Sequence, residues 1–274
     1  MKFSCEQQKL TKALNVVSKA VTSRSTIPIL KGIMLEVTSE GKLTMSASDL
    51  DISIQDTIDV NTTEPGAIIV MAKLFGDIIR KLPSVEINIE SDDENNVTIK
   101  CMNSEFKIIG MSTDEFPNVN MVSEETEAID FNKSELRKMI DKTSFAASND
   151  ESRGVITGVL IELTPDQMNM VAIDGYRMAI NRKAKVSTNP GNIIISAKII
   201  SEISRIIGET DSDEENGKML LSEKKVIFKF DNIQAELKLI DGEFINYKDI
   251  LPKDSKITAK VNRANFMESI ERAS

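Results

Sequence analysis

No histidine occurs in the 274 residues, and this removes most of the side-chain chemistry that enzymes use. Ser-His-Asp and Cys-His nucleophiles, imidazole general bases and histidine-containing metal sites all need a residue that the chain lacks. Only two cysteines are present, Cys5 and Cys101, without a CxxC spacing. This usage is typical of buried apolar side chains in a reducing compartment and predicts neither a disulfide nor a metal clip.

One pair of carboxylates has a spacing that could serve a nuclease. Asp49 and Asp51 stand two residues apart in the stretch SASDLD, and paired carboxylates can act as acid and base. The segment recurs later in the chain, where Asp174 matches Asp49 but Tyr176 takes the second position. A structural turn therefore fits Asp49 better than catalysis.

An acidic stretch, DSDEENG at residues 211–217, resembles a calcium-binding loop only in composition. Asn216 stands where such a loop needs glycine, and Ser222 stands where it needs a bidentate glutamate. A solvated hairpin is the better interpretation. The sequence therefore predicts no catalytic residue, no metal site and no cofactor.

The remaining charges are unevenly distributed. Lys and Arg total 34 against 43 Asp and Glu, a net charge of −9, which argues against simple adhesion to nucleic acid. Yet the four segments with helical periodicity carry +2, +2, +2 and +1, which leaves −16 for the remainder. Those segments are residues 6–20, 72–82, 132–146 and 196–207.

The order cation, anion, cation at i, i+4 and i+7 recurs opposite the apolar face of two predicted helices. Its members are Lys73, Asp77 and Arg80, and then Lys198, Glu202 and Arg205. One interpretation is a set of ordinary surface charges paired across one turn. The other is a mildly cationic helical surface that contacts a phosphate backbone without reading its sequence.

The positions of these segments follow from an internal duplication. PGAIIVMAKLFGDIIR at residues 65–80 aligns without a gap with PGNIIISAKIISEISR at residues 190–205, at an offset of 125, and eight of the sixteen positions are identical. A period this long indicates whole-domain duplication. Each copy orders an amphipathic helix, alternating strands, a Pro-Gly turn, a second helix and closing hairpins, so each is predicted to be α+β.

Residues 261–274 resemble residues 131–144, which indicates a third copy beginning near residue 257. The predicted domains are residues 1–122, residues 128–252, and residues 257–274 as the first strand and helix of a third domain. That helix has no partner sheet in these residues, so we expect it to be poorly ordered or to use a neighbour's surface.

Several motifs then resemble one family along nearly the whole chain. They are MKF at the start, Arg24 followed by TIPIL, EPGA, DEFPN, IDGYRMA and KLIDGEFINYKDILP. In this respect the chain resembles the bacterial DNA polymerase III beta subunits, the sliding clamps. The resemblance implies repeated DNA-clamp domains, each with two amphipathic helices packed on antiparallel sheets, in a head-to-tail ring of two subunits around duplex DNA.

The resemblance also implies the partners and the location. They are double-stranded DNA, the replicative polymerase, a clamp-loader complex, and other polymerases and repair proteins that bind through short peptides. The N-terminus has no apolar signal-peptide core and no aliphatic run could span a bilayer, so we expect a cytoplasmic protein without a membrane partner.

Three sets of residues take roles from the resemblance. The DNA-binding cations are Arg24, Lys73, Arg80, Arg137, Lys142, Arg153, Lys198 and Arg205. The partner-peptide pocket comprises Ile156, Ile173, Gly175, Tyr176, Arg177, Met178, Ile245 and Ile250, although Ile156 and Ile173 would also suit a core. The subunit interface comprises Ile78, Leu82, Phe106 and Ile108, which we expect to be exposed.

Two departures from the family pattern limit these expectations. Ile245 and Asn246 stand where the GxFPDY pattern has proline and aspartate, so peptide preference could differ. The third domain would supply the rest of the pocket and half of each interface, so these 274 residues are not expected to close a ring. The rival function is a protein-interaction scaffold that never touches DNA, which would need no cationic helix face.

Overall fold

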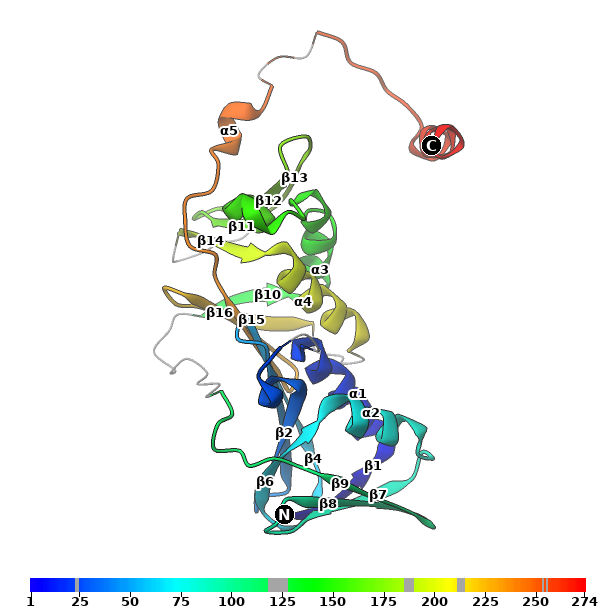
Figure 1. Ribbon diagram of the computed structural model, residues 1–274. Coiled ribbons are helices and arrows are strands. Elements are labelled where there is room, and N and C mark those ends of the chain that lie inside the picture. The colour runs from blue at the N-terminus through cyan, green and yellow to red at the C-terminus, as the bar shows by residue number, and fades with distance from the viewer. Residues whose placement is uncertain (23–24, 118–127, 185–189, 211–214, 253, 255) are drawn as a thin grey trace. The chain divides into compact units, whose positions relative to one another are not determined.

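The computed structural model describes residues 1–22, 25–117, 128–184, 190–210, 215–252, 254 and 256–274 (Figure 1). The chain divides into two compact units, Met1–Glu243 and Phe244–Ser274. The predicted repeats both lie in the first unit. Within the described residues, no helix is long and apolar enough to cross a membrane.

The first repeat alternates short strands with two α-helices. Its helices are α1 (Gln7–Val17) and α2 (Ala72–Lys81), with the 3-10 turns η1 (Ser18–Ala20) and η2 (Pro28–Lys31). Its strands are β1 (Lys2–Glu6), β2 (Gly32–Val37), β3 (Lys42–Ser48), β4 (Ile52–Asp59), β5 (Asn61–Glu64), β6 (Gly66–Met71), β7 (Glu86–Ser91), β8 (Asn96–Cys101) and β9 (Ser104–Ile109).

The second repeat follows the same order of elements. Its helices are α3 (Lys133–Asp141) and α4 (Ala197–Glu209), with η3 (Ser144–Ala146) and η4 (Glu151–Thr157). Its strands are β10 (Ala128–Asn132), β11 (Gly158–Leu163), β12 (Gln167–Ile173), β13 (Met178–Ala184), β14 (Gly191–Ser196), β15 (Asn216–Leu221), β16 (Lys225–Phe230) and β17 (Ile233–Lys238).

The sheets reveal a connection that the sequence patterns did not predict. One five-stranded sheet has the order β5-β1-β7-β8-β9 and one four-stranded sheet has the order β13-β12-β11-β14. Between them, an eight-stranded sheet runs β10-β15-β16-β17-β4-β3-β2-β6 and so contains strands of both repeats. β17 of the second repeat pairs antiparallel with β4 of the first, with Ala235 opposite Ile54.

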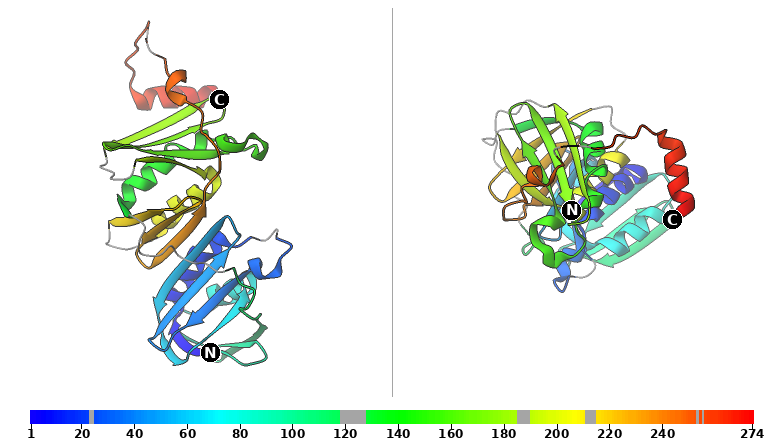
Figure 2. Two further views of the ribbon diagram at one scale, coloured as in Figure 1. Left: turned by 90° about the vertical axis from the view of Figure 1, so that its left-hand side faces the viewer. Right: turned by 90° about the horizontal axis from the view of Figure 1, so that it is seen from above.

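The helices form because each has an apolar stripe to bury. In α1, Leu10, Ala13, Leu14 and Val17 recur at three- and four-residue spacing and are buried. α1 contacts α2, and α3 contacts α4, as packed pairs. In the left view of Figure 2, the strands of the first unit face the viewer and α1 lies behind them. Each helix therefore presents its polar face away from the sheets.

One lysine counted in the positive helical charge is not on the surface. Lys133, at the start of α3, is 6% exposed, and its Nζ donates to both carboxylate oxygens of Asp231 at 2.8 and 3.0 Å. The long lysine side chain instead reaches into the β16–β17 turn, so this charge is neutralised internally.

The second unit contains α5 (Tyr247–Ile250) and α6 (Arg263–Ala273). No residue of α6 is buried, as expected for a helix without a partner sheet. The strand predicted at the start of the third copy is absent, since residues 257–262 form no strand. In the two repeats, β1 and β10 are held by β7 and β15, whereas no strand of the described residues pairs with residues 257–262.

Candidate functional site

The polar faces of the helices carry most of the predicted DNA-binding cations. The exposed members are Lys73 and Arg80 on α2, Arg137 on α3, Lys142 at its C-terminal end, and Lys198 and Arg205 on α4. Arg24 lies outside the described residues. The two copies therefore present the same basic positions on the same side of equivalent helices.

The arginines of this face are paired within their own helices. Arg80 contacts Asp77 at 3.0 Å and Arg205 contacts Glu202 at 2.5 Å, each across one turn. Exposed pairs of this kind contribute at most about 1 kcal/mol, so either arginine can leave its carboxylate for a phosphate. Among the described residues, neither Lys73 nor Lys198 is in an ion pair.

Arg153 lies apart from these helix cations. It belongs to η4, and its Nη1 donates to the backbone carbonyl of Asp174 at 2.6 Å. Its guanidinium also covers Gly175, where an added Cβ would come within 3.2 Å of Nη2. The resemblance implies a DNA-binding role for Arg153, but the structure places it against the residues predicted for the peptide pocket.

A tight turn between β12 and β13 builds the centre of that predicted pocket. The Asp174 carboxylate accepts hydrogen bonds from the backbone amides of Tyr176 and Arg177 at 2.9 and 3.0 Å and from Arg177 Nε at 2.9 Å. These contacts hold the pKa of Asp174 below its usual value, the backbone bonds having the largest effect. Gly175 supplies the left-handed conformation of the turn, with φ 94°.

The turn displays aromatic surface on one side and rests on aliphatic residues. Tyr176 is 97% exposed. The Arg177 guanidinium lies 5.7 Å from the ring centre of Phe145, a half-exposed residue that the sequence analysis missed. Its only signal was an aromatic residue within the polar run KTSFAASND. Ile156 and Ile173 are each only 7% exposed, so they pack beneath the turn and do not form its contact surface.

Six of the eight predicted pocket residues come from η4 and from the β12–β13 region. Met178, at the start of β13, is half-buried. The other two, Ile245 and Ile250, belong to the second unit and are 43% and 51% exposed. Within the first unit, the structure therefore brings its six predicted pocket residues together.

The predicted interface residues differ in exposure. Leu82 and Ile108 are each only 8% exposed, so the expectation that both would be exposed is wrong. Leu82 ends α2 over the core, and Ile108 points inward from β9. Phe106 is 39% exposed and Ile78 is half-buried. The alternation of β9 places Phe106 and Ile108 on one face of the strand, and Ile109, 77% exposed, on the other.

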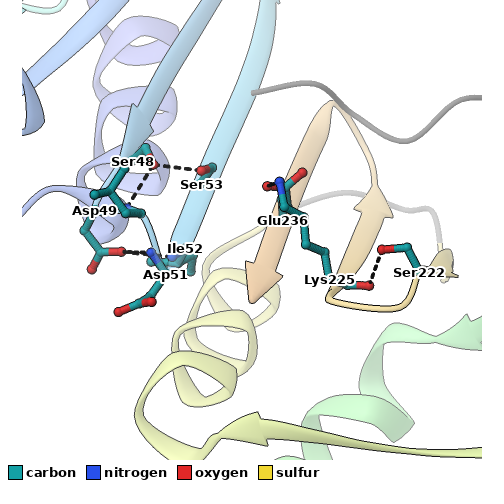
Figure 3. Close-up of polar contacts among 9 residues, drawn as sticks. Ser48, Asp49, Asp51, Ile52, Ser53, Ser222, Lys225 and Glu236 are labelled. Carbon is teal, nitrogen blue, oxygen red and sulfur yellow. Dashed lines mark hydrogen bonds and ion pairs between the residues drawn. The ribbon is translucent and has the colours of Figure 1, made fainter. Parts of the chain in front are cut away.

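Asp49 forms a turn in the first repeat, as the sequence indicated. Its carboxylate accepts the backbone amides of Asp51 and Ile52 at 3.0 and 2.9 Å, as Figure 3 shows. Asp51 lies 3.6 Å from Lys238 of the second repeat. Within the described part of the chain, no group of three or more Cys, Asp or Glu is placed to hold a metal ion. Residues 211–214 of the acidic stretch lie outside that part.

Comparison with known proteins matches both repeats to one family. The DNA polymerase III beta subunit N-terminal domain matches residues 1–120, and its central domain matches residues 130–246. The beta sliding clamp of Bacillus subtilis (strain 168) is 33% identical over 285 residues, covering 100% of this chain and 74% of that protein.

Solved structures agree with this match. The crystal structure of the DNA polymerase sliding clamp from Bacillus subtilis has a TM-score of 0.94 at 32% identity, covering 100% of this chain and 73% of the other. The beta subunit of the DNA polymerase of Streptococcus pyogenes has a TM-score of 0.90 at 29% identity, covering 100% and 73%. The chain therefore belongs to the DNA polymerase III beta subunit family, the sliding clamps of DNA replication.

Proposed function

We propose that this chain acts by topology: it forms part of a closed ring that encircles duplex DNA and keeps the replicative polymerase at the primer end. Sliding clamps are non-catalytic processivity factors, and the function of this chain is that of a DNA sliding clamp. A ring must be opened before it leaves DNA, whereas contacts between its lining and phosphates can stay weak. The net charge of −9 supports this mechanism, because strong adhesion would need a basic protein.

The observation that carries the proposal is the junction between the repeats. β17 of the second repeat pairs with β4 of the first. In the order of elements, β9 is the counterpart of β17 and β13 is the counterpart of β4, and both are edge strands in the described sheets. One junction repeated head to tail gives a ring when the rotation closes. On this basis β9 and β13 are the two joining edges of the chain.

The helix cations are proposed to line the hole of that ring. Lys73, Arg80, Arg137, Lys142, Lys198 and Arg205 occupy exposed positions on helices away from the sheets, and Arg24 is proposed with them. Such contacts with phosphates carry no sequence information, so the ring can slide. The position of Arg153 makes it a pocket residue in this proposal instead.

The turn around Gly175 is proposed to receive partner peptides. An extended peptide with glutamine and bulky apolar residues would place an aliphatic anchor against Tyr176, Arg177 and Met178. Ile245 and Ile250 keep the pocket role that the resemblance implies for them. The polymerase, a clamp loader, and other polymerases and repair proteins would then compete for one site, with cytoplasmic DNA replication as the setting.

Retention on circular DNA tests the mechanism. A version that carries a third repeat is loaded onto a nicked circle by a clamp loader, and the circle is then cut. We expect retention on the circle in moderate salt and rapid loss after linearisation. Equal retention on both would mean ordinary adhesion and would contradict a ring.

A charge-reversed variant separates the clamp from the scaffold that never touches DNA. Lys198→Glu with Arg205→Glu is expected to weaken DNA contact and leave peptide binding intact. Lys218→Glu with Lys229→Glu, on strands β15 and β16, is the matched control. Unchanged DNA retention in the helix variant would favour the scaffold.

A further inference from the structure

A groove of about 450 Å³ opens where the two repeats meet, and its lining residues include none of the turn around Gly175. Its walls come from α1, β4, the C-terminal end of α4 and the turn between β16 and β17. Val16, Ile58 and Ile233 give it an apolar floor. The clamp mechanism makes no use of it.

A buried carboxylate lies in this groove. The inward-facing row of β4 reads Ile52, Ile54, Asp56, Ile58, so Asp56 interrupts a row of isoleucines. Asp56 is 7% exposed, and it pairs in the sheet with Met45 on one side and Ile233 on the other. An ionised side chain is costly in such surroundings unless an opposite charge accompanies it.

The other carboxylates of the groove already have lysine partners. Asp59 contacts Lys42 at 2.5 Å, Glu209 contacts Lys19 at 2.9 Å, and Asp231 contacts Lys133 at 2.8 Å. Among the described residues, no side chain pairs with the carboxylate of Asp56. The α1 wall adds Lys9 and Lys12 to the lining, and any cationic ligand must avoid these two residues.

We propose that this groove is a binding site for a small organic cation with a flat apolar body, whose amidinium or ammonium group pairs with Asp56. The apolar body rests on Val16, Ile58 and Ile233. The cation supplies the positive charge that no described side chain places against the Asp56 carboxylate. Lys9 and Lys12 repel the cationic group and so restrict its approach to one orientation. The ligand bridges α1 and β4 of one repeat and the β16–β17 turn of the other.

The ionisation of Asp56 gives the site a defined pH dependence. Burial raises the pKa of Asp56 to about 6; the hydrogen bond from the Thr57 backbone amide opposes this rise, and the charge of Asp231 adds a smaller increase. Only the ionised carboxylate pairs with a cation. One pH unit below this pKa about a tenth of the groups are ionised, so affinity should fall about tenfold between pH 7.5 and pH 5.

Benzamidine and its uncharged relative benzamide are the probes. The intact chain is titrated with each at pH 7.5, and the methyl resonances of Val16, Ile58 and Ile233 are followed by NMR. Benzamidine is expected to shift these resonances saturably and benzamide is not. Asp56→Asn should weaken benzamidine binding at least tenfold, whereas Asp59→Asn, at the exposed rim of the same groove, should leave it within twofold.

The proposal is overturned if benzamidine causes no saturable shift, if benzamide binds equally well, or if Asp56→Asn binds like the unmodified chain. Should Asp56→Asn lose its folded spectrum, the unmodified chain decides through pH. A roughly tenfold weaker affinity at pH 5 then supports the site, and an unchanged affinity contradicts it.

Discussion

At the scale of single residues, the matched turns of the two repeats differ at one strained position. Leu50 has φ 79° and is 58% exposed, whereas its counterpart Gly175 has φ 94°. A left-handed conformation costs a leucine about 1–2 kcal/mol, and an exposed leucine gains little from burial. We expect Leu50→Gly to raise the free energy of unfolding by about 0.5–1 kcal/mol, after the greater chain entropy of glycine is counted.

Urea denaturation of Leu50→Gly and Gly175→Ala measures this difference. Gly175→Ala should lower the free energy of unfolding by about 1 kcal/mol, because alanine would have to adopt the left-handed conformation beneath the Arg153 guanidinium. A less stable Leu50→Gly protein would show that the Leu50 side chain makes a contribution greater than its strain.

Asp56 should make the stability of the chain depend on pH in a particular direction. Its pKa is raised from 3.8 to about 6 in the folded state. Its neutral form is therefore favoured by folding, and this contribution is complete below the unfolded pKa and is lost as the pH rises through about 6. Asp56→Asn removes the titrating group, so the variant should be more stable than the unmodified chain at pH 7.5.

The difference between the two proteins, measured in urea at pH 7.5 and pH 5, isolates Asp56 from the other carboxylates. We expect the advantage of Asp56→Asn to shrink by about 1 kcal/mol at the lower pH. Asp59→Asn, an exposed residue of the same strand, is the control. An advantage that grows toward pH 5 would show that the sign is wrong.

At the scale of elements, the junction of β17 with β4 rests on a polar pair that is only half satisfied. Glu236 Oε1 accepts from Lys225 Nζ at 2.6 Å, while the buried Oε2 has no hydrogen-bond partner in the described part of the chain (Figure 3). Glu236 lies opposite Ser53 of the first repeat. The pair therefore stands directly on the connection between repeats.

Removing the lysine should weaken that connection. Lys225→Met leaves the Glu236 carboxylate buried without a counter-charge, so we expect the free energy of unfolding to fall by about 1–3 kcal/mol. This is less than for a fully buried ion pair, because the Lys225 side chain is 45% exposed. Adding Glu236→Gln should restore most of the loss. The measurement is denaturation of both variants, and a second variant no better than the first would point to lost packing of the lysine stem instead.

The elements were largely predictable from the sequence, and their lateral partners were not. The 3.6-residue period and the duplicated PG turn placed α2 and α4 within two residues, because those signals are local. The β17–β4 pairing joins residues about 180 positions apart, and no periodic pattern in the sequence indicates which distant strands pair, so the shared sheet was not predicted. The burial of Lys133 and the position of Arg153 were missed for the same reason, since both depend on turns contributed by distant strands.

At the scale of the whole molecule, the edge strands β9 and β13 decide how these 274 residues assemble by sheet pairing of the β17–β4 kind. β9 corresponds to β17 and β13 to β4, so two copies could in principle join edge to edge. Their inward rows do not match, however. The inward row of β4 reads Ile52, Ile54, Asp56 and Ile58, whereas that of β13 reads Ala179, Asn181 and Lys183, with Lys183 paired to Glu135 of α3.

A sheet junction without a buried apolar row gains little from pairing, because most of the free energy comes from the side chains that become covered. We therefore expect the 274-residue chain to sediment at its own mass of 30.4 kDa, and a version with a third repeat to sediment as a dimer. Sedimentation velocity over a range of concentrations checks both. A stable ring of two or three unextended chains would mean that β13 accepts β9 despite its polar row, and that the junction is held by its backbone hydrogen bonds.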